Sequence, residues 1–167
     1  KNTSCLKLIA VARGNPVNVD IQAAQERNIP IIHTPGRNAI AAAEFTMGLI
    51  LSLVRNIARS DRALRAGKYL SGEARSFSGA NSNRDVIWDI DGDSPYTTFC
   101  GIELYGKTLG LIGFGNVATH VARLAQAFGM QVLAYSPKSD PMKMAAENVK
   151  MVDLPDMLGP VTIRTRW

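Results

Sequence analysis

Cysteine is scarce in this sequence, and its scarcity excludes two classes of small protein. Cys5 and Cys100 are the only cysteines among 167 residues. They cannot supply a disulfide framework or a zinc site of paired cysteines. Few cysteines are also typical of a reducing compartment, so we expect a cytoplasmic protein.

Long apolar runs and runs of like charge are missing as well. The most apolar stretch, residues 45–54, is far shorter than a membrane span, and residues 1–11 lack the layout of a signal peptide. The net charge of +5 comes from dispersed basic residues, which favours a solvated basic surface over a nucleic-acid interface. We therefore expect neither a membrane nor a nucleic acid as partner.

The first 36 residues carry alternating strand and helix patterns. Residues 6–12 and 29–32 have the composition of short strands, and residues 19–27 have helical periodicity behind a capping Asp20. Strand, helix and strand in this order predict a parallel crossover. Residues 1–36 therefore belong to a different α/β sheet, or to an edge of one, and they are too few to form a domain alone.

Residues 38–66 are predicted to form one long helix, with Asn38 as its N-cap and Gly67 after its last turn. The first half is apolar nearly all round, which requires burial on more than one side. The second half carries arginines that suit the C-terminal end of the helix dipole. We interpret Glu44, within the apolar half, as structural.

Residues 68–106 are rich in serine, glycine, asparagine and aspartate, and are predicted to be a long surface loop. Asp89, Asp91 and Asp93 alternate as in a calcium-binding loop. However, Gly92 is out of register and Cys100 stands where the closing glutamate belongs. No metal site is therefore predicted.

The clearest motif is a glycine-rich turn between a short apolar strand and a helix. The turn reads Gly113-Phe114-Gly115-Asn116-Val117-Ala118, which matches G-x-G-x-x-A. The first glycine allows a tight turn, the second lets a pyrophosphate approach the backbone, and the alanine lets the helix pack closely. The free N–H groups of the helix then face the phosphates. We predict a dinucleotide site at Gly113, Phe114, Gly115, Asn116 and Val117; a glycine turn without a ligand is the alternative.

The end of the second strand, residues 130–135, departs from this fingerprint. An acidic residue that accepts from the ribose hydroxyl is expected there, but Ser136 occupies the position. Serine can bond a ribose yet carries no charge to repel a 2′-phosphate, and Lys138 can pair with one. We predict that Tyr135, Ser136 and Pro137 complete the cofactor site, with NAD preferred and NADP open.

The remaining residues continue the α/β alternation only briefly. A helix is predicted over residues 140–147, a strand over 149–152 and a short helix from 154 to 158. The core of the dinucleotide unit is thus residues 107–158, followed by an atypical tail, 159–167. Since this fold needs further strands, we expect the chain to stop before they form.

Short motifs outside the glycine turn form a more specific pattern. They are Val17-Asn18-Val19-Asp20, Asn28-Ile29-Pro30, Thr34-Pro35-Gly36, Ala43-Glu44-Phe45-Thr46, Arg65-Ala66-Gly67-Lys68, Gly106-Lys107-Thr108-Leu109-Gly110 and Ala127-Phe128-Gly129-Met130. With them the sequence resembles the D-specific 2-hydroxyacid dehydrogenases, the family of phosphoglycerate and glycerate dehydrogenases.

The resemblance implies an α/β fold with two parts. Residues 37–167 would be a partial Rossmann NAD(P)-binding domain, a doubly wound parallel sheet. Residues 1–36 would be the end of the first segment of a flavodoxin-like substrate domain. The long interdomain helix, 37–67, would join them and, as in relatives, help to form a homodimer.

The resemblance also implies site residues. Ala12, Arg13, Gly14 and Asn15 match the loop whose backbone holds the carboxylate of a small 2-hydroxy or 2-oxo acid, although relatives usually have two closely spaced glycines there. The family's catalytic Arg, Glu and His are C-terminal to anything present, so no catalytic residue is assigned. His33 and His120 do not match that histidine; we interpret the first as structural and the second as solvated.

The expected function is thus that of a fragment of an NAD(P)-dependent oxidoreductase. It would move hydride between nicotinamide and a small D-2-hydroxy acid such as phosphoglycerate or glycerate. The alternative is a dinucleotide-binding regulator, like the corepressors that share this fold. We expect the chain alone to be inactive, with apolar faces over residues 38–54 and 117–128 exposed.

Overall fold

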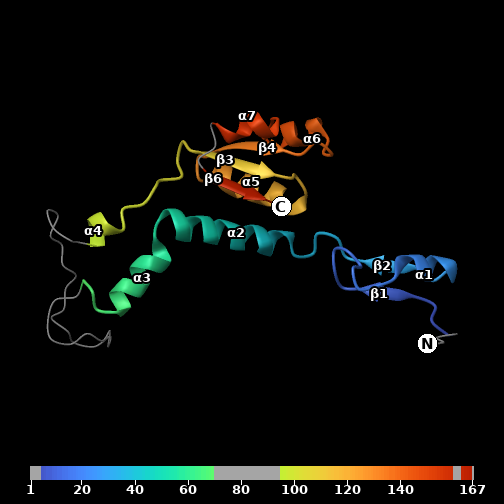
Figure 1. The fold of residues 1–167 in the computed structure, drawn as a ribbon. Coiled ribbons are helices and arrows are strands. Elements are labelled where there is room, and N and C mark those ends of the chain that lie inside the picture. Colours follow the sequence, from blue (N-terminus) through green and yellow to red (C-terminus); the bar gives the residue numbers. More distant parts are fainter. Residues whose placement is uncertain (1–4, 70–94, 160–162, 167) are drawn as a thin grey trace.

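Two parallel sheets organise the chain: the smaller lies beyond the N-terminal end of helix α2 (Ala39–Val54), and the larger lies alongside that helix (Figure 1). The computed structural model describes residues 5–69, 95–159 and 163–166. The aspartates of the calcium-like pattern lie outside these residues. The smaller sheet has the order β1-β2 and the larger one the order β5-β4-β3-β6. This arrangement confirms the α/β fold with parallel sheets that the sequence predicts.

The small unit at the N-terminal end is the predicted strand–helix–strand crossover. It consists of β1 (Ile9–Val11), α1 (Ile21–Glu26) and β2 (Ile31–His33), and the two strands pair in parallel. Asp20 caps α1, since its carboxylate accepts from the N–H of Ala23 at 3.0 Å. Both strands are shorter than the sequence predicts.

The predicted single helix over residues 38–66 is wrong, because the chain forms two helices there. α2 (Ala39–Val54) and α3 (Ile57–Arg65) are bent by 63° from one another. Asn56 lies between them with φ of 54°, a left-handed conformation that asparagine tolerates. Asn38 makes no side-chain cap bond at the start of α2. Among the described helices none is by itself long and apolar enough to cross a membrane, although this bent pair meets both criteria jointly.

A distant segment holds this bend. The N–H of Ile102 donates to the carbonyl of Val54 at 2.8 Å, and Asn56 Nδ2 donates to the carbonyl of Cys100 at 3.2 Å. The first bond satisfies the Val54 carbonyl, which a continuous helix would pair internally, and the second ties the residue at the bend to the crossing segment. The helix therefore ends where residues 100–102 cross it.

α3 ends as predicted, and a short helix packs near it. Gly67 has φ of +75° and donates to the carbonyl of Leu64, the usual geometry after a last helical turn. The ring of Phe99, just after α4 (Pro95–Thr98), meets Tyr69 edge-to-face with centroids 5.6 Å apart. Arg59 of α3 lies 5.9 Å above the same ring.

The larger sheet is built from alternating strands and helices. In chain order these are β3 (Thr108–Ile112), α5 (Asn116–Ala127), β4 (Gln131–Tyr135), α6 (Pro141–Ala146), β5 (Lys150–Met151), α7 (Leu154–Leu158) and β6 (Ile163–Arg166). β3 is central and pairs in parallel with both β4 and β6.

The expectation that the chain stops before another strand forms is therefore wrong. β6 lies in the tail after residue 159 and pairs with β3, with Ile163 opposite Leu109. The strand order reverses direction at β3, since β4 and β5 lie on one side of it and β6 on the other. Such a reversal opens a crevice at the carboxyl ends of the strands, where open α/β sheets bind ligands.

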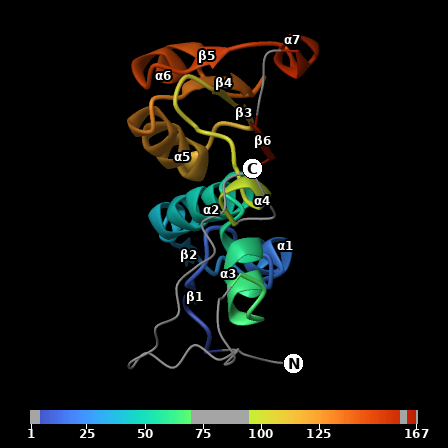
Figure 2. The same cartoon turned by 90° about the vertical axis from the view of Figure 1, so that its left-hand side faces the viewer.

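α2 and α5 pack against each other beneath the large sheet (Figure 2). The buried residues of α5, including Ala118, Val121 and Ala122, join Ala43 and Met47 of α2 in one core. The expectation of an exposed apolar face on α5 is thus wrong for most of that helix. Four large apolar side chains of α2 do remain exposed, namely Ile40, Phe45, Leu49 and Leu53.

A bidentate ion pair joins α5 to the end of α6. Arg123 Nε donates to Glu147 Oε2 at 2.7 Å and Nη2 to Oε1 at 2.5 Å. These hydrogen bonds lower the pKa of the Glu147 carboxyl below its ordinary value. Gln126 Nε2 also donates to the carbonyl of Glu147 at 2.8 Å, so the loop before β5 is fixed against α5.

Candidate functional site

The glycine turn leaves β3 and opens directly into α5. Gly113 has φ of +94°, which favours glycine, and its N–H donates to the carbonyl of Tyr135 at 2.8 Å. Gly115 is the N-cap, and a Cβ built on it meets nothing within 4 Å. In the described part of the chain, no group accepts from the N–H of Gly115, Asn116 or Val117. The turn therefore presents free donors to open space, as an anion site requires.

A pocket of about 340 Å³ lies at this helix start. Its lining residues are Gly36, Asn38 and Ala39 from before and within α2, and Gly115, Asn116, Val117 and Ala118 from the turn. A Cβ on Gly36 would lie 2.8 Å from Asn116 Nδ2, so the two segments are in close contact. Sequence reasoning did not assign Gly36, Asn38 or Ala39 to a site; the motif Thr34-Pro35-Gly36 was the available signal.

Ser136 bonds the end of β4 to the glycine turn. Its side chain is buried, and its Oγ accepts from the N–H of Phe114 at 3.1 Å. Ser139 Oγ lies 2.8 Å from Ser136 Oγ and donates to the carbonyl of Phe114 at 3.2 Å. Since Ser139 has one hydroxyl proton, Ser136 is the donor between the two hydroxyls. The sequence did not single out Ser139.

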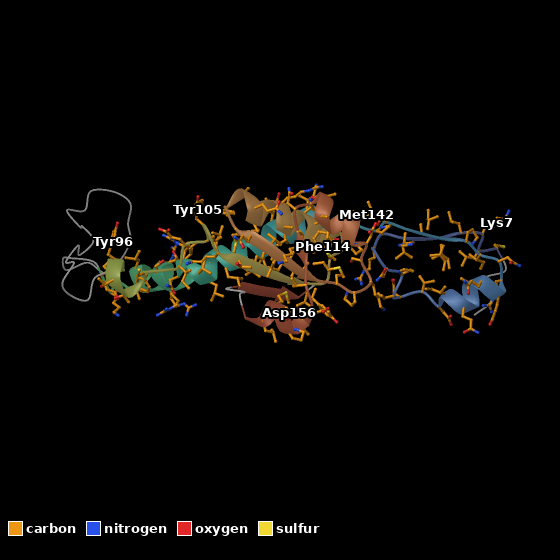
Figure 3. All side chains as sticks on the ribbon, turned by 90° about the horizontal axis from the view of Figure 1, so that it is seen from above. Lys7, Tyr96, Tyr105, Phe114, Met142 and Asp156 are labelled. Carbon is orange, nitrogen blue, oxygen red and sulfur yellow. The ribbon has the colours of Figure 1, made fainter. Side chains whose placement is uncertain are left out.

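The predicted cofactor residues meet at the carboxyl ends of β3 and β4. The side chain of Phe114 is buried in the core (Figure 3), and its N–H is taken by Ser136. Tyr135 is half-buried and contributes its carbonyl to the turn, while Pro137 and Lys138 are exposed beside it. The structure thus brings residues 113–117 together with residues 135–137 at one edge of the sheet.

The predicted carboxylate loop borders a second pocket. This pocket, of about 390 Å³, is lined by Ala12, Arg13, Gly14, Asn15, Val17, Arg37 and Asn38. Two bonds from the end of β2 hold the loop: Thr34 N–H donates to Arg13 O at 3.0 Å, and His33 Nδ1 to Gly14 O at 2.7 Å. His120, in contrast, lies half-buried on α5 and borders neither pocket. Asn38 lines both pockets, so they are neighbours.

Comparison with known proteins decides the family. The profile of the D-isomer specific 2-hydroxyacid dehydrogenase, NAD binding domain, matches residues 47–163. The chain belongs to this family. This dehydrogenase domain is an NAD-binding domain, and the free N–H groups and open space at Gly115 fit a pyrophosphate.

Relatives and solved structures agree with this assignment. The chain is 36% identical to a hydroxypyruvate reductase of Thermotoga maritima, over 96% of this chain and 46% of that protein. It is 34% identical to a D-3-phosphoglycerate dehydrogenase of Methanocaldococcus jannaschii, over 89% and 24%. The crystal structure of the TT0316 protein from Thermus thermophilus superposes with a TM-score of 0.75 at 27% identity, over 98% and 44%. The chain therefore spans less than half the length of each of these proteins. The two named relatives are dehydrogenases or reductases, which favours a dehydrogenase over a corepressor.

Proposed function

We propose that this dehydrogenase domain serves an oxidoreductase that transfers hydride between a nicotinamide cofactor and a small D-2-hydroxy acid. Phosphoglycerate and glycerate are the substrates to test first, since relatives are named for phosphoglycerate and hydroxypyruvate. The observation that carries the proposal is the shared lining residue Asn38. Because Asn38 lines both pockets, the glycine turn at residues 113–117 and the loop at residues 12–15 border adjoining pockets.

We assign the cofactor's phosphates to one pocket and the acid to the other. The N–H groups of Gly115, Asn116 and Val117 would hold the pyrophosphate, with help from the positive end of the α5 dipole. The loop Ala12 to Asn15 would hold the acid's carboxylate, with Arg13 and Arg37 adding positive charge. When bound, NAD accepts hydride from the carbinol carbon, while the hydroxyl proton leaves to a base. No residue of this sequence is assigned as that base, so the proposal concerns binding and orientation.

The test is a titration of the chain with NADH, followed by the cofactor's own fluorescence. Saturable binding that tightens when a small 2-oxo acid is added is expected, because the two pockets adjoin. Absence of NADH binding by folded chain contradicts the proposal.

Ser136 provides a prediction about cofactor choice. Aspartate at this position keeps an acceptor for the Phe114 N–H and adds the charge that bonds a ribose and repels a 2′-phosphate. Ser136→Asp is expected to shift the ratio of NADPH to NADH dissociation constants toward NADH by about 1–3 kcal/mol. The ratio is measured by parallel titrations. An unchanged ratio would show that this position does not contact the ribose.

We also propose that the intact protein is a cytoplasmic homodimer formed through the region of residues 38–66. The support is a row of exposed apolar side chains on α2, formed by Phe45, Leu49 and Leu53, in which Phe45 and Leu53 are 68% and 76% exposed. Charging the row with Leu49→Lys is expected to shift the protein from dimer to monomer in analytical ultracentrifugation. A monomeric wild type would refute this part of the proposal.

A further inference from the structure

His33, which we interpret from the sequence as structural, also contacts the loop that borders the 390 Å³ pocket. It is the last residue of β2, its side chain is exposed, and Nδ1 lies 2.7 Å from the carbonyl oxygen of Gly14. A carbonyl only accepts, so Nδ1 must carry the proton and donate. Nδ1–H is present both in this neutral tautomer and in the imidazolium, so the bond does not depend on whether Nε2 is protonated.

The next residue makes the same kind of contact with the preceding peptide. The N–H of Thr34 donates to the carbonyl of Arg13 at 3.0 Å. Two successive carbonyls of the loop, those of Arg13 and Gly14, are thus turned toward the end of β2. One is held by the backbone and the other by the imidazole.

The geometry of the peptide bond determines where the N–H groups of these two peptides point. These peptides are trans and planar, so each N–H points opposite to the carbonyl of the same peptide. The N–H groups of Gly14 and Asn15 therefore point away from β2, and both residues line the 390 Å³ pocket. Neither N–H has an acceptor among the described residues.

The same pocket carries positive charge and no acid. Arg13 and Arg37 are both exposed lining residues, and neither forms an ion pair within the described part of the chain. None of its lining residues is Asp or Glu. Two adjacent free N–H groups beside two guanidinium groups suit a carboxylate.

We propose that His33 is a positioning residue for the carboxylate loop: its Nδ1–H holds the Gly14 carbonyl away from the pocket and so presents the Asn15 N–H to the acid's carboxylate. This inference rests on the proposed function for the identity of the anion. Without the imidazole donor, the peptide between Gly14 and Asn15 is free to turn, since glycine opposes such rotation least. A rotated peptide would present a carbonyl, which repels a carboxylate.

Two variants of similar size distinguish the effect of losing the hydrogen-bond donor from the effect of changing the size of the side chain. His33→Asn keeps an N–H donor at the position of Nδ1, whereas His33→Leu removes it without adding charge. Because the side chain is exposed, neither substitution disturbs a packed core. The chain is labelled with ¹⁵N and titrated with pyruvate, and the Gly14 and Asn15 amide resonances report binding.

The expected result is pyruvate affinity within about twofold of wild type for His33→Asn and about tenfold weaker for His33→Leu, the loss of one bond to a charged group. The wild-type ring is expected to be Nδ1-protonated when neutral. Three results would overturn the proposal. They are equal pyruvate affinity in both variants, a neutral wild-type ring that is protonated at Nε2, and no response of the wild type to pyruvate. NADH is titrated separately and followed by the amide resonances of Gly113 to Val117. A failure of cofactor binding is therefore distinguished from a failure of pyruvate binding, which the amides of Gly14 and Asn15 report.

Discussion

Gly115→Ala is expected to weaken NADH binding by about 100-fold, or about 2.8 kcal/mol, while the protein stays folded. The added methyl group meets no protein atom within 4 Å, and φ of −102° is open to alanine. The methyl instead fills the space through which a pyrophosphate reaches the backbone. The lost bonds from N–H groups to a charged phosphate are each worth about 1.5–3 kcal/mol.

Stability and affinity are separated by measuring both on the same variant. Thermal unfolding of Gly115→Ala should differ from wild type by about 1 kcal/mol or less, the scale of an N-cap change. Gly48→Ala is the matched control, because its Cβ also meets nothing within 4 Å but it lies on α2 outside both pockets. NADH affinity that is retained in Gly115→Ala would show that the cofactor does not approach this turn.

Gly101→Ala is expected to destabilise the protein by about 2–4 kcal/mol. A Cβ there would collide with the carbonyl oxygen of Val54 and lie 2.9 Å from the Cα of Arg55. Both are backbone atoms, so no side chain can rotate to relieve the contact. Relief requires the chain at residues 100–102 to leave the end of α2, which also removes the bond from Ile102 to Val54.

Calorimetry or circular dichroism measures the effect as a fall in Tm, about 2–4 °C per kcal/mol for a chain of this size. Gly48→Ala again serves as control and should stabilise α2 by about 0.5–1 kcal/mol, since alanine replaces a helical glycine. A Tm for Gly101→Ala equal to that of wild type would show that residues 100–102 do not cross the helix end closely. The bend at Asn56 would then need another cause.

Local patterns in the sequence were sufficient for the elements that depend on near neighbours. The G-x-G-x-x-A turn predicts a helix after its glycines, and α5 begins there at Asn116. Asp20 and Gly67 mark a helix start and a helix end where the structure has them. The motifs also predict the family, which the profile match confirms. These features arise from backbone preferences and periodicity within a few residues, which a sequence displays directly.

Contacts between distant residues decided the rest, and no local pattern encodes them. The end of α2 is set by residues 100–102, where Asn56 bonds a carbonyl 44 positions away. Ile163–Arg166 has a strand partner only because β3 offers a free edge, and the Ser136 hydroxyl is engaged because Phe114, 22 positions earlier, presents its N–H. The adjoining pockets at Asn38 likewise exist only once the β1–β2 unit and α5 are folded. The sequence by itself determined the family and the elements whose signals are local. Tertiary packing decided where α2 ends, which donors remain free and which sites meet, because each of these depends on groups that only folding brings within hydrogen-bond distance.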